Sequence, residues 1–438
     1  MVMEVVEVHY HGKQVGAVSY DTERRSSAFE YDAAFVREGI PLSPLMMPLS
    51  QQIYTFPALG YDTFKGLPGL LADSLPDDFG NAVLNAWVAA QGKSADAITP
   101  LQRLQYTGLR GMGALEYRPA SNTNRLNSAH EVSIASLVSI AQDVLDDRND
   151  FKLALQDDGQ EDRDGMLELL SVGMSAGGAR PKAVLAFNES FTEARSGQAQ
   201  VPEGFTHYLM KFDGVSEHNK NRETFGDPLG FGAMEYVYHL MAKACGIEMM
   251  PCRLLDEGNR RHFLTQRFDR RGNTKIHVQT LNGMAHVDYK QHGSYSYEQL
   301  FGVVRKLKLS ATDAEQLLRR MVFNIVARNH DDHAKNFSFL LDGTKWKLAP
   351  AYDIAYSYKP GSQWVGSHWM RFNGKQDNFT RTDFHQLEPV SHIFTPDKLN
   401  EVIEEVTEQV SKWPSLAEEN GVPQALISEV QSNLRLNL

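Results

Sequence analysis

Cysteine is nearly absent from this 438-residue sequence, which contains only Cys245 and Cys252. So few thiols exclude a disulfide scaffold, their spacing does not match a zinc motif, and both facts favour a reducing compartment. The sequence also lacks an apolar run long enough to cross a bilayer. Residues 1–8 are acidic and alternating, which predicts a strand and not a signal peptide. We therefore expect a cytoplasmic protein with no membrane partner.

Positive charge is also scarce, with 44 Lys and Arg against 55 Asp and Glu and a net charge of −11. This balance argues against a surface that grips nucleic acid by bulk electrostatics, although DNA contact through a partner stays open. The chain is too long for one typical core. We expect domains at 1–165, 166–275 and 276–438, with the acidic stretch 146–164 as a solvated linker.

The first domain is expected to be β-rich with short helices. Strands are predicted at 5–10, 15–20 and 29–35. Pro76 and the acids behind it indicate a helix start, and residues 81–90 continue with a helical period. A second amphipathic helix is predicted at 133–145. Nothing in this domain demands catalysis, so a scaffold or docking role is the simplest interpretation.

A glycine-rich segment, 171–182, opens the second domain. Its glycines would let the backbone approach a ligand closely and turn N–H groups toward phosphate oxygens. It is not a Walker A loop, because no Lys-Ser or Lys-Thr follows Gly178. Such a segment before a strand is most often only a turn.

The order of the following elements gives that segment more weight. A strand at 206–212 carries Lys211, a helix at 233–245 carries Glu235, and two strands follow at 251–255 and 262–268. This is the order of a protein-kinase small lobe and hinge. In such a lobe the strand lysine grips the α- and β-phosphates, a helix carboxylate orients the lysine, and the hinge backbone contacts adenine.

The stretch 329–353 carries the chemistry. Asp331 and Asn336 have the D-x-x-x-x-N spacing of a kinase catalytic loop. Two short strands, 337–341 and 345–348, form a hairpin that leads to Asp353. One carboxylate can meet the attacking hydroxyl, while an amide oxygen and a second carboxylate hold Mg²⁺. A helix capped by Ser310 or Thr312 and buried through its apolar stripe supports this loop.

Other interpretations of the loop remain open. Its consecutive side chains at 330–333 (His, Asp, Asp, His) could form a transition-metal cluster or the centre of a metal-dependent phosphohydrolase. They could also be a polar loop that caps the preceding helix. We expect His333 to orient Asp331 and not to bind metal, because Mg²⁺ prefers oxygen ligands.

Four segments together resemble one family, the HipA-type serine/threonine kinases, which are toxins of bacterial toxin–antitoxin modules. They are residues 70–77, 175–182, 267–271 and 331–338, the last followed by Tyr352 and Asp353. The resemblance covers nearly the whole chain and implies an α+β protein. It implies a bilobal kinase-like core with a β-rich small lobe (166–275), an all-helical large lobe (276–438) and an N-terminal β-rich extension (1–165).

The resemblance also implies roles for individual residues. Catalytic roles fall on Asp331, His333 and Lys335, and the Mg²⁺ ligands are Asn336 and Asp353. The residues expected to bind ATP are Ser175, Ala176, Gly177, Gly178, Lys182, Lys211, Glu235, Gln266, Arg267, Phe268 and Tyr352. Ser175 matches the serine that such kinases autophosphorylate to switch themselves off, because the added charge would repel ATP. Gln266 stands where a close relative would carry Glu.

The partners implied by the resemblance are a small helix-turn-helix antitoxin and a translation factor, above all an aminoacyl-tRNA synthetase, as substrate. DNA contact is expected only through the antitoxin complex. A catalytically weak, kinase-like regulator that acts as a co-repressor with the antitoxin is the alternative.

Overall fold

The structure, a computed structural model, describes residues 4–90, 92, 94, 98–120, 128–146, 180–216 and 226–438. The chain divides into two compact units. The first comprises residues 1–41, 49–232 and 252–277, and the second comprises 42–48, 233–251 and 278–438. The predicted glycine-rich segment up to Ala179 lies outside the described residues, as does the acidic stretch beyond Asp146. The division into three domains stays a prediction.

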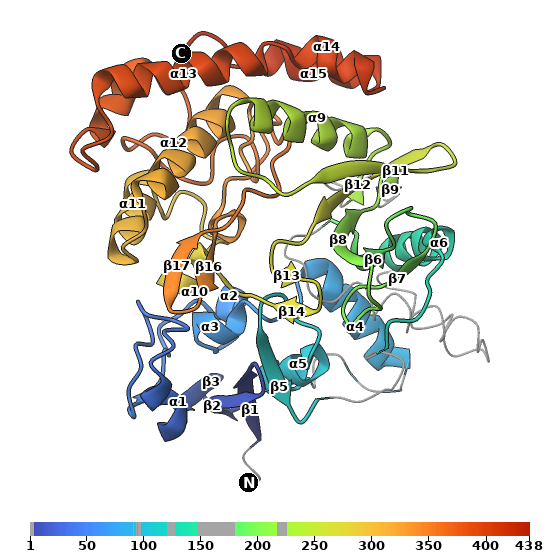
Figure 1. The fold of residues 1–438 in the computed structure, drawn as a ribbon, viewed down its shortest axis with the longest axis vertical. Helices are drawn as coiled ribbons and strands as arrows, with labels where there is room; N and C mark the ends of the chain where they lie inside the picture. The colour runs from blue at the N-terminus through green and yellow to red at the C-terminus, as the bar shows by residue number, and fades with distance from the viewer. Residues whose placement is uncertain are drawn as a thin grey trace. The chain divides into compact units, whose positions relative to one another are not determined.

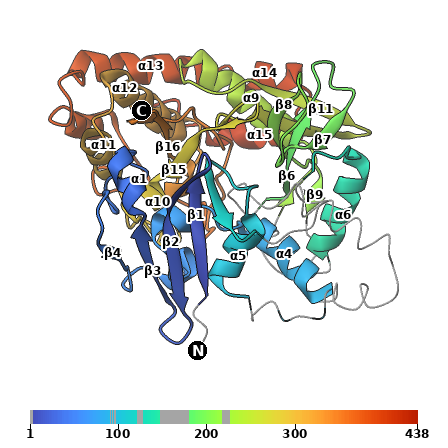
Figure 2. The ribbon, with the colours of Figure 1, turned by 60° about the horizontal axis from the view of Figure 1, so that its bottom comes forward.

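A five-stranded antiparallel sheet in the order β4-β3-β2-β1-β5 begins the first unit. Its strands are β1 Val5–Tyr10, β2 Lys13–Asp21, β3 Ser26–Tyr31, β4 Ile53–Tyr54 and β5 Leu115–Arg118. Figure 2 shows the first three strands side by side. Val6, Val8, Val18 and Phe29 are fully buried, so one face of this sheet packs on a core.

Short helices connect this sheet to the rest of the unit. They are α1 Ala33–Glu38, α2 Tyr61–Phe64, α3 Gly69–Ala72 and α5 Pro100–Thr107. The expected third strand, 29–35, is wrong in its second half. The side chain of Asp32 accepts hydrogen bonds from the N–H groups of Ala34 and Phe35, and this cap starts α1 where the strand was expected to continue.

The second sheet of this unit has the order β11-β12-β8-β6-β7 and is antiparallel throughout. Its strands are β6 Lys182–Phe187, β7 Ala194–Ser196, β8 Thr206–Lys211, β11 Cys252–Glu257 and β12 Arg260–Gln266. Small strand pairs β9 Val215–Ser216 with β10 Gly226–Asp227, and β13 Arg270–Arg271 with β14 Thr274–Lys275, flank it.

Two helices cover this second sheet, α4 Asp78–Ala90 and α6 Ile134–Asp146. Both lie beside β6 in Figures 1 and 2. The predicted stripe of α4, which includes Val83, Leu84 and Val88, is buried in the same core as Leu185 and Met210 of the sheet. The helical periods at 81–90 and 133–145 therefore predicted both helices correctly, because each buries one apolar face.

A buried ion cluster joins the two sheets of the first unit. Asp269, which is fully buried, binds Arg267 at 2.7 and 2.8 Å and Arg270 at 2.7 Å. It also accepts the N–H of Gly113 at 2.8 Å, and Arg270 donates to the carbonyls of Gly111 and Gly113 just before β5. The segment after β12 is therefore held to the N-terminal sheet by charge-assisted hydrogen bonds.

The second unit is mainly helical. Its helices are α9 Phe231–Ala244 (which begins in the first unit), α10 Leu281–Ala285, α11 Tyr297–Lys306, α12 Ala311–Val326, α13 Pro396–Val410, α14 Trp413–Glu419 and α15 Gln424–Asn433, with 3₁₀ turns at Ala334–Asn336 and Arg381–Leu387. A three-stranded sheet, β15 His277–Thr280, β16 Ser338–Asp342 and β17 Lys345–Leu348, accompanies them. In Figures 1 and 2, α13 lies alongside α12.

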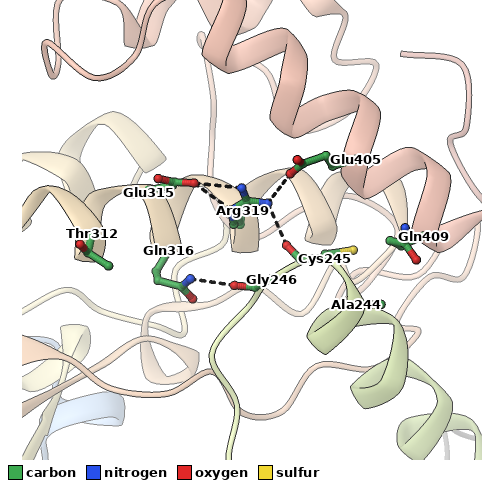
Figure 3. Close-up of a pocket in the computed structure, with 9 residues that line it drawn as sticks. All are labelled: Ala244, Cys245, Gly246, Thr312, Glu315, Gln316, Arg319, Glu405 and Gln409. Atoms are coloured by element: carbon green, nitrogen blue, oxygen red, sulfur yellow. Dashed lines mark hydrogen bonds and ion pairs between the residues drawn. The ribbon is translucent and has the colours of Figure 1, made fainter.

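Arg319 of α12 connects three helices of the second unit at a cavity of about 530 Å³. Figure 3 shows its guanidinium between two carboxylates, Glu315 of α12 at 2.9 Å and Glu405 of α13 at 2.7 Å. The guanidinium also donates a hydrogen bond to the carbonyl of Cys245, just after α9. No predicted site residue lines this cavity. We interpret it as a structural joint that fixes α9 and α13 on α12. No helix among the described residues is long and apolar enough to cross a membrane.

Candidate active site

Helix α12 delivers the predicted catalytic loop. Ser310 and Asp313 form a reciprocal capping box at its start, which satisfies two otherwise orphaned N–H groups. The helix ends at Val326, and Tyr238 of α9 donates a hydrogen bond to the carbonyl of the next residue, Ala327, at 2.7 Å. The loop therefore starts from a support that two packed helices hold in place.

Asp332 fixes the interior of the loop. Its fully buried carboxylate accepts hydrogen bonds from the Tyr297 hydroxyl at 2.7 Å, His368 Nδ1 at 2.9 Å and the N–H groups of Trp369 and Met370 at 2.7 and 3.4 Å. His368 is also fully buried. A buried carboxylate with this many donors is stable, and it anchors the loop to α11 and to the segment 368–370.

Asp331, unlike Asp332, has a partly exposed side chain. Its side chain is 37% exposed, and its Oδ1 lies 3.6 Å from Nε2 of His333. Asn336 donates its amide N–H₂ to the backbone carbonyl of Asp331 at 2.7 Å, which leaves the amide oxygen as the atom suited to a hard cation. The turn Ala334–Asn336 brings these two residues together.

The hairpin β16–β17 returns the chain to Asp353. Tyr352 donates to the carbonyl of Lys335 and pairs with the hydroxyl of Ser338, so the segment that carries Asp353 adjoins the catalytic loop. Asp353 has a left-handed backbone with φ 53°, a conformation that costs free energy in a non-glycine residue and that is frequent at functional sites.

Helix α12 also holds the chain between the hairpin and Asp353. Asp313 accepts the N–H of Leu348 at 3.1 Å, and buried Arg320 donates to the carbonyl of Ala349 at 2.6 Å. One helix therefore positions both the loop with Asp331 and the segment with Asp353. Oxygen donors from Asn336 and Asp353 on adjoining segments fit a magnesium ion chemically.

In the first unit, two predicted lysines face each other. Lys182 of β6 and Lys211 of β8 are register partners on adjacent antiparallel strands, and both are buried. Nζ of Lys182 lies 3.4 Å from a carboxylate oxygen of Asp77, whose other oxygen accepts the N–H of Gly80 at the start of α4. Two predicted nucleotide-binding residues therefore lie side by side on neighbouring strands.

The predicted hinge follows β12. Gln266 pairs with Tyr208 of β8 at the strand end. The side chain of Arg267 is committed to Asp269, and its N–H donates to the carbonyl of His207 at 2.9 Å. The backbone N–H of Arg267 and two nitrogens of its guanidinium are therefore already used, which leaves its backbone carbonyl and Nη1. Phe268 is partly buried next to it.

Some predicted pairings cannot be assigned from the described residues. Ser175, Ala176, Gly177 and Gly178 lie outside them. Glu235 is buried in α9 within the second unit, whereas Lys211 belongs to the first unit. Their pairing stays a prediction.

The alternative of a transition-metal cluster at residues 330–333 does not match the geometry. His330 is fully buried, packs against His368 at 4.0 Å and has a pKa held well below its usual value by burial and by the nearby His368. Asp332 is occupied by the partners named above. Among the described residues, no group of three or more His, Cys, Asp or Glu could hold a metal ion.

Sequence analysis missed the aromatic surroundings of Asp331. Trp364 is 56% exposed and stacks on Trp369 at 6.0 Å, and Trp369 and Tyr289 both pack against His333. Two of the five tryptophans of the chain lie within six residues here, and this density was the available signal. Exposed aromatic surfaces of this kind are typical of binding sites.

Comparison with known proteins identifies the family of the chain. The family model described as the HipA-like C-terminal domain matches residues 174–413, and the HipA N-terminal domain matches residues 6–118. The chain is 21% identical over 371 residues, which are 80% of this chain and 74% of its relative, to the serine/threonine-protein kinase toxin HipA of Shewanella oneidensis. It is 31% identical over 124 residues to Y4mE of Sinorhizobium fredii, but that match spans only 26% of this chain and 30% of Y4mE.

The fold also matches a solved structure. HipA in its complex with HipB and operator DNA from Shewanella oneidensis aligns with 98% of this chain and 95% of its own chain, with a TM-score of 0.67 and 17% identity. This likeness confirms the predicted α+β fold, a kinase-like core with an N-terminal β-rich region. The second unit contains a three-stranded sheet in addition to its helices. With both family models matched along most of its length, the chain belongs to the HipA family.

Proposed function

We propose that this protein is an ATP-dependent serine/threonine protein kinase of the HipA type. The observation that carries the proposal is the catalytic loop, in which exposed Asp331 lies on a backbone anchored by buried Asp332. A general base must be reachable by the hydroxyl of the substrate and rigidly placed. The family membership and the name of its Shewanella relative support the same reaction.

The second unit supplies the catalytic groups. Asp331 accepts the proton of the attacking hydroxyl, and His333 positions its carboxylate. Lys335, whose ammonium lies 4.6 Å from the ring centroid of Tyr289, stabilises the transferred phosphoryl group. Asn336 and Asp353 hold magnesium. When bound, this ion neutralises charge on the phosphates.

The first unit supplies most of the nucleotide contacts. Lys211 binds the phosphates, with Lys182 beside it on the next strand. The backbone of Gln266, Arg267 and Phe268 receives adenine, and Tyr352 of the second unit lies next to the metal ligand Asp353. Glu235 orients Lys211. Ser175, Ala176, Gly177 and Gly178 cover the phosphates, and phosphorylation of Ser175 switches the enzyme off by adding negative charge.

The cellular role that we propose is that of a toxin. The Shewanella relative was solved with HipB and operator DNA, which supports a small helix-turn-helix antitoxin as partner and DNA contact through that complex. The proposed substrate is a translation component such as an aminoacyl-tRNA synthetase.

Transfer of labelled γ-phosphate from Mg²⁺-ATP tests the proposal. The substitutions Asp331→Asn and Asp353→Asn should each lower the rate by about 10²–10⁴-fold, because each removes a group needed only for the reaction. Asp342→Asn is the matched control, since Asp342 lies at the exposed turn between β16 and β17, in the hairpin that leads to Asp353. Equal rates for Asp331→Asn and the control would contradict the proposal. No transfer by any variant, the unsubstituted protein included, would favour the regulator that only binds an antitoxin.

A further inference from the structure

The first unit contains a cavity of about 500 Å³ that is separate from every residue assigned to ATP. It lies among the segment before β5, the strands β13 and β14, and the loop 198–200. The lining residues that matter here are Arg110, Glu116, Gln198, His207, Arg270 and Lys275. Its volume falls in the range of sites that bind small molecules.

Two buried polar side chains that line this cavity lack partners among the described residues. Gln198 is only 3% exposed, and neither its amide nitrogen nor its amide oxygen has a hydrogen-bond partner. His207 is equally buried; its Nδ1 pairs with the carbonyl of Gly197 at 2.8 Å, but Nε2 has no partner. Leaving such groups unsatisfied costs free energy, so each needs an explanation. A polar ligand with both a donor and an acceptor would satisfy them.

The charged side chains around the cavity favour a ligand with negative charge. The lining contains three cationic side chains, from Arg110, Arg270 and Lys275, and one carboxylate, from Glu116, which pairs with Lys275. Arg270 pairs with Asp269 behind the wall. Burial lowers the pKa of Arg110 to about 10, and burial also lowers the pKa of Lys275. An anion would relieve this excess.

We propose that this cavity binds a small organic anion, a phosphate- or carboxylate-bearing metabolite no larger than a mononucleotide. Its anionic group faces Arg110, Arg270 and Lys275, and its polar part bonds to Gln198 and His207. Because the wall is built from both sheets of the first unit, the bound ligand would strengthen the junction around Asp269, which directly follows the predicted hinge. This inference does not depend on the proposed kinase activity.

Calorimetry and thermal unfolding of the full chain test the site, with inorganic phosphate, citrate and ribose 5-phosphate as probes in EDTA without nucleotide. At least one probe should raise the Tm of the wild type and bind with measurable heat. Gln198→Leu should weaken that binding at least tenfold. Without any probe it should raise the Tm by about 1–3 °C, because it removes an unsatisfied buried amide.

Gln316→Leu is the matched control. Gln316 lines the cavity of the second unit, but its amide is satisfied by the N–H of Glu248 at 2.7 Å and the carbonyl of Gly246 at 2.8 Å. This variant should therefore lose Tm and keep wild-type binding of the probe. The proposal is overturned if none of the three anions binds at millimolar concentration, or if Gln198→Leu lowers the Tm as Gln316→Leu does.

Discussion

Asp331 and Asp332 are neighbours in the sequence but have opposite environments. Asp331 is 37% exposed beside His333, whereas Asp332 is fully buried with four hydrogen-bond donors. A carboxylate that is exposed at a rigid loop is available to a substrate, and one that is surrounded by donors holds the loop in shape. The same residue type is therefore accessible at one position and holds the loop in shape at the next.

This contrast predicts different effects for the same substitution. Asp332→Asn should lower the free energy of unfolding by about 3 kcal/mol or more, because it breaks a buried pair with His368 and replaces an acceptor by a donor. Asp331→Asn should change it by less than about 0.5 kcal/mol while it abolishes phosphate transfer. Urea unfolding of both variants measures the difference. Equal losses of stability would show that Asp331 is structural too.

At the scale of elements, the start of α4 is linked to the strand β6. Asp77 both caps the helix, through the N–H of Gly80, and pairs with Lys182 in a site where both side chains are almost fully buried. One carboxylate therefore connects the N-terminal motif 70–77 with the strand that follows the glycine-rich segment.

Replacing that carboxylate tests the connection. Asp77→Asn should destabilise the protein by about 3–5 kcal/mol, because it removes the negative charge that lies 3.4 Å from the buried ammonium of Lys182. Asp78→Asn is the control, since Asp78 is exposed in the first turn of the same helix and should cost at most about 1 kcal/mol. Chemical unfolding of the two variants gives the comparison. A loss for Asp77→Asn no larger than that for Asp78→Asn would contradict the role of the pair.

At the scale of the whole molecule, both units bury histidines. Burial lowers the pKa of His207 and His262 in the first unit, and of His239 and His286 in the second, to about 4 in each case. These rings stay neutral in the folded protein but become protonated in the unfolded chain below about pH 6.5. Unfolding then takes up protons, so stability is greatest above pH 6.5 and falls as the pH drops toward 4.

Calorimetric Tm values at pH 7.5, 6 and 5 should therefore decrease in that order. His262→Gln should weaken this dependence, because one buried titrating ring is gone. A Tm that stays constant between pH 7.5 and 5 would rule out this account of the histidines.

Sequence patterns predicted the regular elements well where one face of an element is buried. The stripe of α12, the core face of α4 and the hairpin before Asp353 follow from local periodicity and turn residues. Local patterns could not show that α1 begins directly after Asp32, because the side-chain cap of Asp32 and not the apolar pattern ends the strand. They could also not show the Asp269 cluster or the partners of Asp332, because these pair residues far apart in the chain.

Phosphopeptide mass spectrometry of the protein from producing cells, wild type beside Asp331→Asn, tests the central claim most directly. The account predicts that the wild type carries phosphate on the peptide containing Ser175, that a translation component is phosphorylated in the same cells, and that both modifications disappear with Asp331→Asn. Equal phosphorylation in the two samples, or none in the wild type, would contradict the account.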